Sequence, residues 1–305
     1  MANPRWDLPT PNYEKDVNEL KRIYRRGIQE TILTLEDLAT QGKSDKTISR
    51  SQMNSVLNQL GVSLAELDSE AEAWVREEIN KAFKGGQAHA LIALGEVGAM
   101  EKAAKMASKS RLARTSIEAM VADTFEDLLY ANNKMKRESV KMVRNIVAEQ
   151  MKVAAVQGQG LNFTKKSIVE RFHEEGNIAI VDRMGRRWKL DTYSEMVSRT
   201  KMTQAHVEGT RVESLERGVD LAIISSHGAT DACRFYEGQI ISMNGDTPGY
   251  LTYEELRRSN LIFHPNCKHK LSPIRDIANL PEVVQDKFYD GAEMAEFQFK
   301  KRKKK

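Results

Sequence analysis

The chain has 305 residues, of which 40% are hydrophobic and 30% are charged, and its formal net charge is +4. This length is sufficient for two domains, and this composition excludes a disordered protein. No apolar run approaches the roughly 18 residues of a membrane span, so we expect no membrane partner. The N-terminal stretch MANPRWDLPTPNYEKD lacks the apolar core of a secretion signal, and two cysteines suit free thiols in a reducing cytoplasm.

The positive charge is concentrated at the C-terminus. Residues 300–305 read KKRKKK, and taking these six from the 47 basic residues leaves 41 against 43 acidic ones, a net charge of −2. A basic segment of this kind seeks phosphate, an acidic surface or solvent. Double-stranded DNA is therefore a candidate partner, although a terminus that only aids solubility fits equally well. The candidate contacts are Lys300, Lys301, Arg302, Lys303, Lys304 and Lys305.

The N-terminal residues predict an extended segment followed by a helix. Residues 1–12 hold three prolines, which cannot continue a helix. From Tyr13 onwards apolar residues recur every three or four positions, which predicts a helix that ends near Gly42. The apolar stripe consists of Val17, Leu20, Tyr24, Ile28, Ile32 and Leu35.

Two further helices are expected before residue 100. A short one covers residues 49–60 and ends at a turn, GVS. The next begins at Ser63, because Glu66 three residues later is typical of a capping box. Gly85 and Gly86 are expected to kink or end this helix.

The longest uninterrupted helical pattern covers residues 116–156, which contain neither Pro nor Gly. Such a length predicts a rod-like helix that packs on neighbours. Those neighbours belong either to an ordinary bundle within the chain or to other copies of it, so a homo-oligomer remains open.

The pattern changes after VQGQG, residues 156–160. We expect a short helix near residues 165–174. The stretch NIAIVDRMGRRWKL has two short apolar-polar runs around Met184 and Gly185, which predicts a hairpin.

A helix capped by Asp191 follows and ends at Gly218. The run VDLAIISS is typical of a buried strand. Residues 225–273 mix Gly, Asn, Pro and Asp with short apolar pieces, so their shape depends on packing or crosslinks, and one helix is expected around residues 252–258.

These patterns predict an α+β fold, with a mainly α-helical N-terminal half built of long helices and a small α+β C-terminal domain. The expected domains are residues 1–160, residues 161–299 and a basic tail at 300–305.

Five potential metal ligands lie within 43 residues. Zinc takes four such ligands, usually as two close pairs, and HGATDAC supplies one pair while HPNCKH supplies the other. Zinc is thus the candidate cofactor. Neither pair has the two-residue Cys spacing of zinc ribbons, so hydrogen-bonded His and buried Cys that shape loops are the alternative interpretation. The five residues are His227, Cys233, His264, Cys267 and His269.

Patterns of catalysis are weaker, and we expect no enzyme. A thiolate at Cys267 needs a base, which normally comes from elsewhere in the fold rather than from a sequence neighbour. The chain lacks a P-loop, a dinucleotide-binding glycine pattern and a Gly-flanked nucleophile turn. Asp231 with His264 and Asn266 is faintly similar to a His-Asn nuclease arrangement. Glu237, Asp246, Glu254 and Glu255 are interpreted as a solvated face or as caps.

Residues 190–275 resemble a known family in the order of several short motifs. A helix opens at Arg199-Thr200 and ends at Gly218, and a strand leads to Ser225-Ser226-His227. Tyr236-Glu237-Gly238 and Asn266-Cys267-Lys268-His269 follow. This order is similar to that of the phage minor capsid protein 2 family, which is related to the Mu F-like head morphogenesis proteins. The sequence departs from the family at Tyr236, where Trp is usual, and at LIFHP, which replaces glycines.

The resemblance implies a structural virion protein that acts near the portal during head assembly. It implies the portal protein and other capsid proteins as partners, contact with packaged DNA, and a location in the virion after assembly in the host cytoplasm. It also implies that HPNCKH closes the small domain as a scaffold. The alternatives are a zinc-stabilised nucleic-acid-binding module, or an enzyme of the nuclease or transferase-toxin type.

Overall fold

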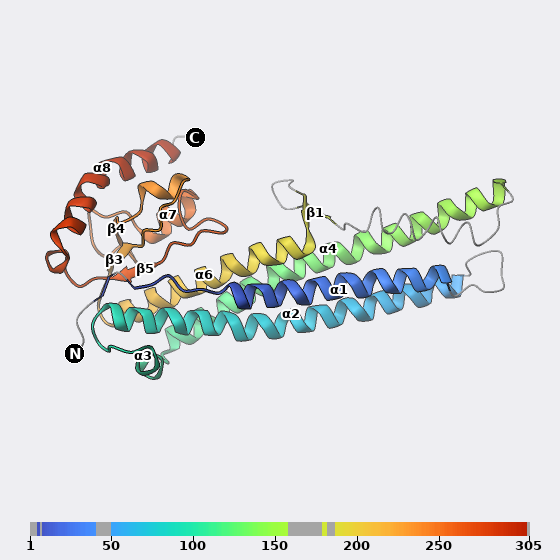
Figure 1. Ribbon diagram of the computed structural model, residues 1–305, viewed down its shortest axis with the longest axis horizontal. Helices are drawn as coiled ribbons and strands as arrows, with labels where there is room; N and C mark the ends of the chain where they lie inside the picture. The colour runs from blue at the N-terminus through green and yellow to red at the C-terminus, as the bar shows by residue number, and fades with distance from the viewer. Residues whose placement is uncertain (1–4, 7, 41–49, 158–178, 182–186, 304–305) are drawn as a thin grey trace. The chain divides into compact units, whose positions relative to one another are not determined.

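The structure is a computed structural model that describes residues 5–6, 8–40, 50–157, 179–181 and 187–303 (Figure 1). Within these ranges the fold is α+β, as predicted, with long helices in the N-terminal half and a three-stranded antiparallel sheet in the C-terminal region. The chain divides into two compact units. Unit 1 comprises Met1–Glu14, Arg76–Asp123 and Ser198–Lys305, and unit 2 comprises Lys15–Val75 and Thr124–Val197.

Three long helices dominate the first half of the chain: α1 (Glu14–Thr40), α2 (Arg50–Ala93) and α4 (Arg111–Gln157). The short α3 (Met100–Met106) precedes α4. The predicted helix after Tyr13 and the predicted long helix near 116–156 are confirmed. None of the described helices is long and apolar enough to cross a membrane.

Unit 2 has a core of helix stripes. Val17, Leu20 and Tyr24 on α1 are fully buried, which confirms this part of the predicted stripe. The indole Nε1 of Trp74 donates to the carbonyl of Asp16 at 3.0 Å and links α2 to α1. Burial of such apolar surface supplies most of the stability of helices of this length.

The predicted break at GVS is wrong, because α2 continues through Gly61 and Ser63. Leu60, Leu64 and Leu67 are all buried, so one apolar stripe spans the supposed turn. Packing of that stripe outweighs the weak helix preference of one glycine and the local cap signal at Ser63.

The glycine pair in α2 does not end the helix either. α2 continues to Ala93, and Gly86 lies where α6 (Leu190–Glu216) crosses it. A Cβ on Gly86 would lie 1.9 Å from the carbonyl oxygen of His206, and one on Gly209 would lie 2.0 Å from the carbonyl oxygen of Phe83. The two glycines therefore permit a close backbone crossing within unit 1.

Unit 1 contains the sheet, whose strands are β3 (Leu221–Ile224), β4 (Ile240–Ser242) and β5 (Leu271–Pro273). The order is β4-β3-β5 and both pairings are antiparallel; Ala222 pairs with Ile241 on one side and with Pro273 on the other. The predicted buried strand is therefore the central one, β3.

Helices lie beside this sheet (Figure 1). α7 (Tyr253–Ser259) confirms a predicted helix, and Thr252 and Glu255 form its capping box. α8 (Glu282–Lys303), for which the sequence suggested no assignment, buries Val284, Ala295 and Phe299. Short 3₁₀ helices η1 (Ala232–Phe235) and η2 (Ile277–Asn279) complete the unit.

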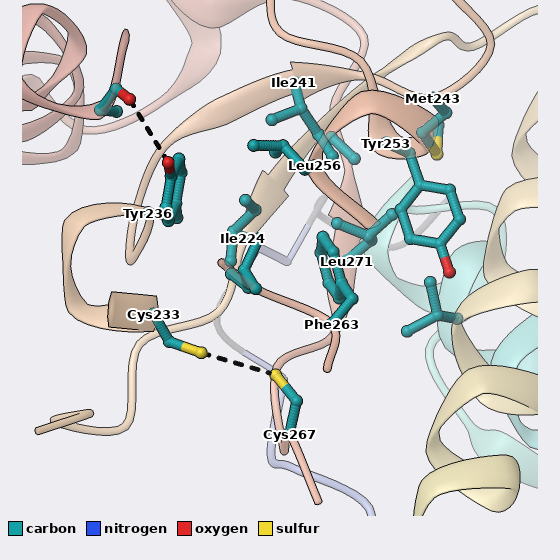
Figure 2. Packing of buried hydrophobic residues seen from close by; sticks show 14 of the residues in the cluster. Ile224, Cys233, Tyr236, Ile241, Met243, Tyr253, Leu256, Phe263, Cys267 and Leu271 are labelled. Carbon is teal, nitrogen blue, oxygen red and sulfur yellow. Dashed lines mark hydrogen bonds between the residues drawn. The ribbon is translucent and has the colours of Figure 1, made fainter. Parts of the chain in front are cut away.

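Two apolar clusters of the described residues include side chains of this sheet, and Figure 2 shows the larger one. It joins the sheet to α7, α8 and the two cysteine-bearing loops, and the thiols of Cys233 and Cys267 face each other at its edge. Its buried members include Ile224, Tyr236, Ile241, Met243, Tyr253, Leu256, Phe263 and Leu271.

The predicted hairpin is confirmed by β1 (Ala179–Val181) and β2 (Arg187–Lys189), in which Ile180 pairs with Trp188. Its predicted turn at Met184-Gly185 and the predicted helix at 165–174 lie outside the described residues. Asp191 was expected to cap α6 but lies within its first turn, because the helix begins one residue earlier, at Leu190. Gly218, just after the end of α6, has φ +68°, a conformation that glycine adopts easily.

Candidate metal centre

Two loops of unit 1 carry the predicted ligands. Cys233 lies in η1, which begins after Asp231; the carboxylate of Asp231 accepts a hydrogen bond from the backbone N–H of Cys233 at 3.0 Å. The second loop turns sharply before β5, where the N–H of Cys267 donates to the carbonyl of His264 at 3.0 Å. Asn266 in this turn has φ +63°, which asparagine tolerates better than most residues.

The second loop is tied to its surroundings at both ends. The N–H of Asn266 donates to Thr200 Oγ1 on α6 at 3.0 Å, and the carbonyl of Lys270 accepts from the N–H of Ser225 at 3.0 Å. The turn is thus fixed relative to α6 and β3.

The structure brings the sulfurs and two histidine nitrogens together. Cys233 Sγ lies 3.9 Å from Cys267 Sγ and 3.0 Å from His264 Nε2. Cys267 Sγ lies 3.2 Å from His269 Nδ1. Both thiols are buried, and they are not joined in a disulfide. The ligand atoms of Cys233, Cys267 and His269 all lie within 4.8 Å of one another.

Each of these two histidines has its other ring nitrogen next to an acceptor. His269 Nε2 lies 3.2 Å from Glu237 Oε1, and His264 Nδ1 lies 2.9 Å from the carbonyl oxygen of Pro265. For His269 this acceptor favours the tautomer in which Nδ1, the nitrogen that faces Cys267, presents a lone pair. His264 Nε2 faces both Cys233 Sγ and Asp231 Oδ2, so both of its nitrogens lie next to acceptors.

His227 occupies a different position. Its ring packs 4.2 Å from that of His269, centroid to centroid, and its Nδ1 lies 3.9 Å from Glu237 Oε1. It therefore lies on the Glu237 side of His269, away from the sulfurs. Among the described residues the five predicted ligands thus fall into three overlapping groups: Cys233 and Cys267 with His269, Cys233 with His264 and Asp231, and His227 with His269 and Glu237.

Glu237 is the residue whose role sequence reasoning missed. Its Oε1 accepts from the backbone N–H groups of His227 and Ala229, at 2.8 and 3.0 Å, besides facing His269. It does cap a loop, as interpreted, but it also orients a histidine. Neither its spacing nor its neighbours in the sequence signal that second role.

The thiol pair is electrostatically asymmetric. The hydrogen bond from Cys233, aided by His269, lowers the pKa of Cys267 despite burial. The same hydrogen bond and burial raise the pKa of Cys233. Burial acts to lower the pKa of His269, but Cys267 and Glu237 outweigh it and the pKa is raised. A negative charge on the pair is therefore favoured at Cys267 over Cys233.

The nuclease-like trio is only partly assembled. His264 Nε2 lies 3.2 Å from Asp231 Oδ2, whose side chain is 56% exposed. Asn266 contributes its backbone N–H to Thr200.

The first residues of the basic segment belong to α8, which runs through Lys303. Lys300 Nζ pairs with Glu296 Oε1 at 2.7 Å, and Arg302 Nε donates to the carbonyl of Ser259 at 3.3 Å. Lys300, Lys301 and Arg302 are exposed. Lys304 and Lys305 lie outside the described residues.

Comparison with known families defines the class as a structural protein of the phage capsid. The family model described as phage minor capsid protein 2 matches residues 18–303, which is nearly the whole chain. The chain therefore belongs to the phage minor capsid protein 2 family, and the resemblance seen over residues 190–275 is confirmed and extended into the helical half. Its location is the virion and its partners are other capsid proteins. No curated protein and no solved structure matches significantly.

Proposed function

We propose that this minor capsid protein acts near the portal during head assembly in the host cytoplasm, and that it binds the portal protein through the outer face of α8. Three apolar side chains carry the proposal: Val283 is 78% exposed, Met294 49% and Phe297 58%. At 3.6 residues per turn they fall within about 60° of one another on the helix.

This face is opposite in character to the inner face of α8. Val284, Ala295 and Phe299 are buried against the sheet, so the helix is already anchored without its outer residues. An aligned set of large exposed apolar residues is typical of a protein-binding surface. Because the partners of this family are capsid proteins, a capsid component is the natural occupant of this face, and the portal protein is the component that we propose.

Co-purification of the full-length chain with portal protein tests this proposal. We expect Met294→Glu combined with Phe297→Glu to abolish co-purification, since two buried charges would oppose docking. The matched control is Leu33→Glu combined with Val62→Glu, the same change at two exposed apolar positions elsewhere, 50% and 59% exposed. Portal retention by the α8 variant, or equal loss in the control, contradicts the proposal.

Contact with packaged DNA is a second proposal, favoured by the exposed Lys300, Lys301 and Arg302 in the last turns of α8. Phosphate contacts weaken with salt, with a slope of about −0.9 per contact in logarithmic units. Removal of residues 300–305 should therefore reduce both DNA retention at low salt and this slope. Unchanged retention contradicts DNA contact without affecting the portal proposal.

An enzymatic role is the competing function. It requires a turnover, on DNA or on a transferable group, that falls when Cys267 or His264 is replaced. The membership of the chain in a structural capsid family supports the assembly role instead.

A further inference from the structure

We propose that Cys233, Cys267, His264 and His269 bind one zinc ion as a closed structural site, with Glu237 as the partner that orients His269. The proposal concerns how unit 1 holds its loops together and is independent of the portal and DNA proposals.

The sulfur atoms already have the separation that tetrahedral zinc imposes. Zinc–sulfur bonds of about 2.3 Å at a tetrahedral angle place two sulfurs about 3.8 Å apart. The observed distance between Cys233 Sγ and Cys267 Sγ is 3.9 Å. A disulfide needs about 2.05 Å, so the sulfurs would have to approach by nearly half. The spacing thus fits a bridging ion better than a bond.

One of the two histidines is already close to its position at such a site. Zinc places a thiolate sulfur and an imidazole nitrogen about 3.5 Å apart. His269 Nδ1 lies 3.2 Å from Cys267 Sγ, so an ion between them replaces the hydrogen bond and opens this distance by a few tenths of an ångström. His264 Nε2 lies 3.0 Å from Cys233 Sγ but groups with Cys233 and Asp231 rather than with Cys267 and His269, so it has to turn toward the ion. Its side chain is 23% exposed, which leaves room for this movement.

The outer contacts of both histidines match those of zinc ligands. A metal-bound histidine almost always donates its second N–H to a carboxylate, a carbonyl or water. Glu237 Oε1 fills this role for His269, and the carbonyl of Pro265 fills it for His264. Glu237 is itself held by the N–H groups of His227 and Ala229. The two histidines are therefore oriented toward the sulfurs from outside.

The ligand chemistry selects zinc. Two thiolates and two imidazoles are soft and borderline donors, which disfavour calcium and magnesium, and iron–sulfur clusters use mostly thiolates. Four protein ligands leave no open position for water or substrate, which distinguishes a structural site from a catalytic one. Asp231, 56% exposed, and His227, on the far side of His269, stay outside the first four ligands.

The position of the site explains why a metal is useful there. It joins η1 to the turn before β5, residues that are 34 apart in sequence and have little regular structure around them. Metal binding to a folded site stabilises that fold directly, because the unfolded chain lacks the preformed ligand set.

The test is elemental analysis of the full-length chain, purified with reductant and dialysed into metal-free buffer. We expect about one zinc per chain in the wild type, and loss of that zinc in Cys233→Ser and Cys267→Ser. His227→Ala is the matched control and should retain it, since His227 lies beside the cluster but outside the proposed ligands.

Replacement of zinc by cobalt in the wild-type protein gives a second measurement that does not depend on whether the cysteine variants fold. The wild-type protein stripped of zinc and loaded with Co²⁺ should show the visible bands of a tetrahedral site and sulfur-to-cobalt charge transfer. His264→Ala should shift these bands, because the fourth ligand becomes water. The proposal is overturned if the purified wild-type protein holds no metal, whether both thiols react with a thiol reagent or the two cysteines form a disulfide. Zinc retained at wild-type content in Cys267→Ser overturns it too.

Discussion

A Cβ on Gly86 would lie 1.9 Å from the carbonyl oxygen of His206, so α2 and α6 cross in unit 1 at a distance that only glycine permits. Thr210 strengthens the crossing, because its hydroxyl donates to the carbonyl of Gly86 at 3.1 Å. The obstacle is backbone rather than a flexible side chain, so it cannot move aside cheaply.

Gly86→Ala should therefore destabilise the protein by about 1–3 kcal/mol, the usual range for overpacking. Gly61 in the same helix provides the control, since an added Cβ there meets nothing within 4 Å. Gly61→Ala should stabilise by about 0.5–1 kcal/mol through helix propensity. Thermal unfolding followed by circular dichroism measures both, and a change of the same sign in the two variants would contradict this account.

Stability should fall in mild acid because of the buried His206. Tyr13 Oη lies 2.8 Å from its Nδ1, its Nε2 lies 3.4 Å from His89 Nδ1, and burial lowers its pKa to about 3. The unfolded chain takes up a proton near pH 6.5, whereas the folded protein does not until about pH 3. His206 therefore contributes its full stabilisation above pH 6.5, and below that pH the free energy of unfolding falls by up to about 1.4 kcal/mol per pH unit.

Urea unfolding at pH 7.5, 5.5 and 4.5 tests this dependence. His206→Gln removes the titrating group but keeps a polar partner for Tyr13, so its stability should fall less steeply. His89, whose pKa burial also lowers, should contribute in the same direction. Equal slopes for the wild type and His206→Gln would show that another group controls the loss.

Asp220, which directly precedes β3, should stabilise the loop that follows β4 above the acid range. Its carboxylate accepts from the hydroxyls of Ser242 and Thr247, both at 2.6 Å, and from the N–H of Asn244 at 2.9 Å. Burial acts to raise its pKa, but these hydrogen bonds prevail and the pKa is lowered. Since the unfolded carboxyl protonates first, the contribution is present above the unfolded pKa near 3.9 and lost as pH falls through the folded value.

Asp220→Asn should cost about 1–3 kcal/mol at pH 7 and weaken the loss of stability in acid. Asp246→Asn is the matched control in the loop that Asp220 holds, where the carboxylate of Asp246 accepts from the side chain of Asn244 at 2.6 Å and is exposed. Chemical unfolding at pH 7 and pH 3 provides the comparison. A control variant that loses as much stability as Asp220→Asn would refute the special position of Asp220.

Glu237→Gln should weaken zinc binding by about 10–100-fold without removing the site, because outer partners of metal-bound histidines typically contribute that much. The amide oxygen can still accept from His227 and Ala229, so the loop should keep its shape. Competition with a chelator measures the affinity. Unchanged affinity would mean that Glu237 only caps the loop.

The elements that the sequence predicted well are those with strong local periodicity. α1, α4, α6 and α7 follow apolar stripes or caps, and β3 follows a β-branched run. The error in α2 arose because Ser63 and Glu66 form a valid local cap signal that the buried Leu60 and Leu64 override. Whether the cap signal or the apolar stripe prevails depends on tertiary packing, about which a local sequence pattern holds no information.

α8 shows the same dependence on distant contacts. It contains Gly291 at its centre, where a Cβ would lie 2.3 Å from Gln239 Nε2, so the glycine serves a close approach to a loop 52 residues earlier. For the metal centre, residue type and clustering identified all four proposed ligands. The sequence did not reveal that His227 is not a ligand or that Glu237 orients His269. Both conclusions depend on the side of the His269 ring on which each residue lies, which only the folded structure shows.

Unit 1 is assembled from three separate stretches of the chain, and this has a consequence for synthesis. The ammonium of Lys270 donates to the carbonyls of Leu8 and Pro9, which are 262 and 261 residues away. Leu8 and Pro9 therefore leave the ribosome long before Lys270 is made. The newly made chain must wait, with part of its apolar surface exposed, until residue 270 has emerged, so its yield should depend on chaperones and on elongation speed.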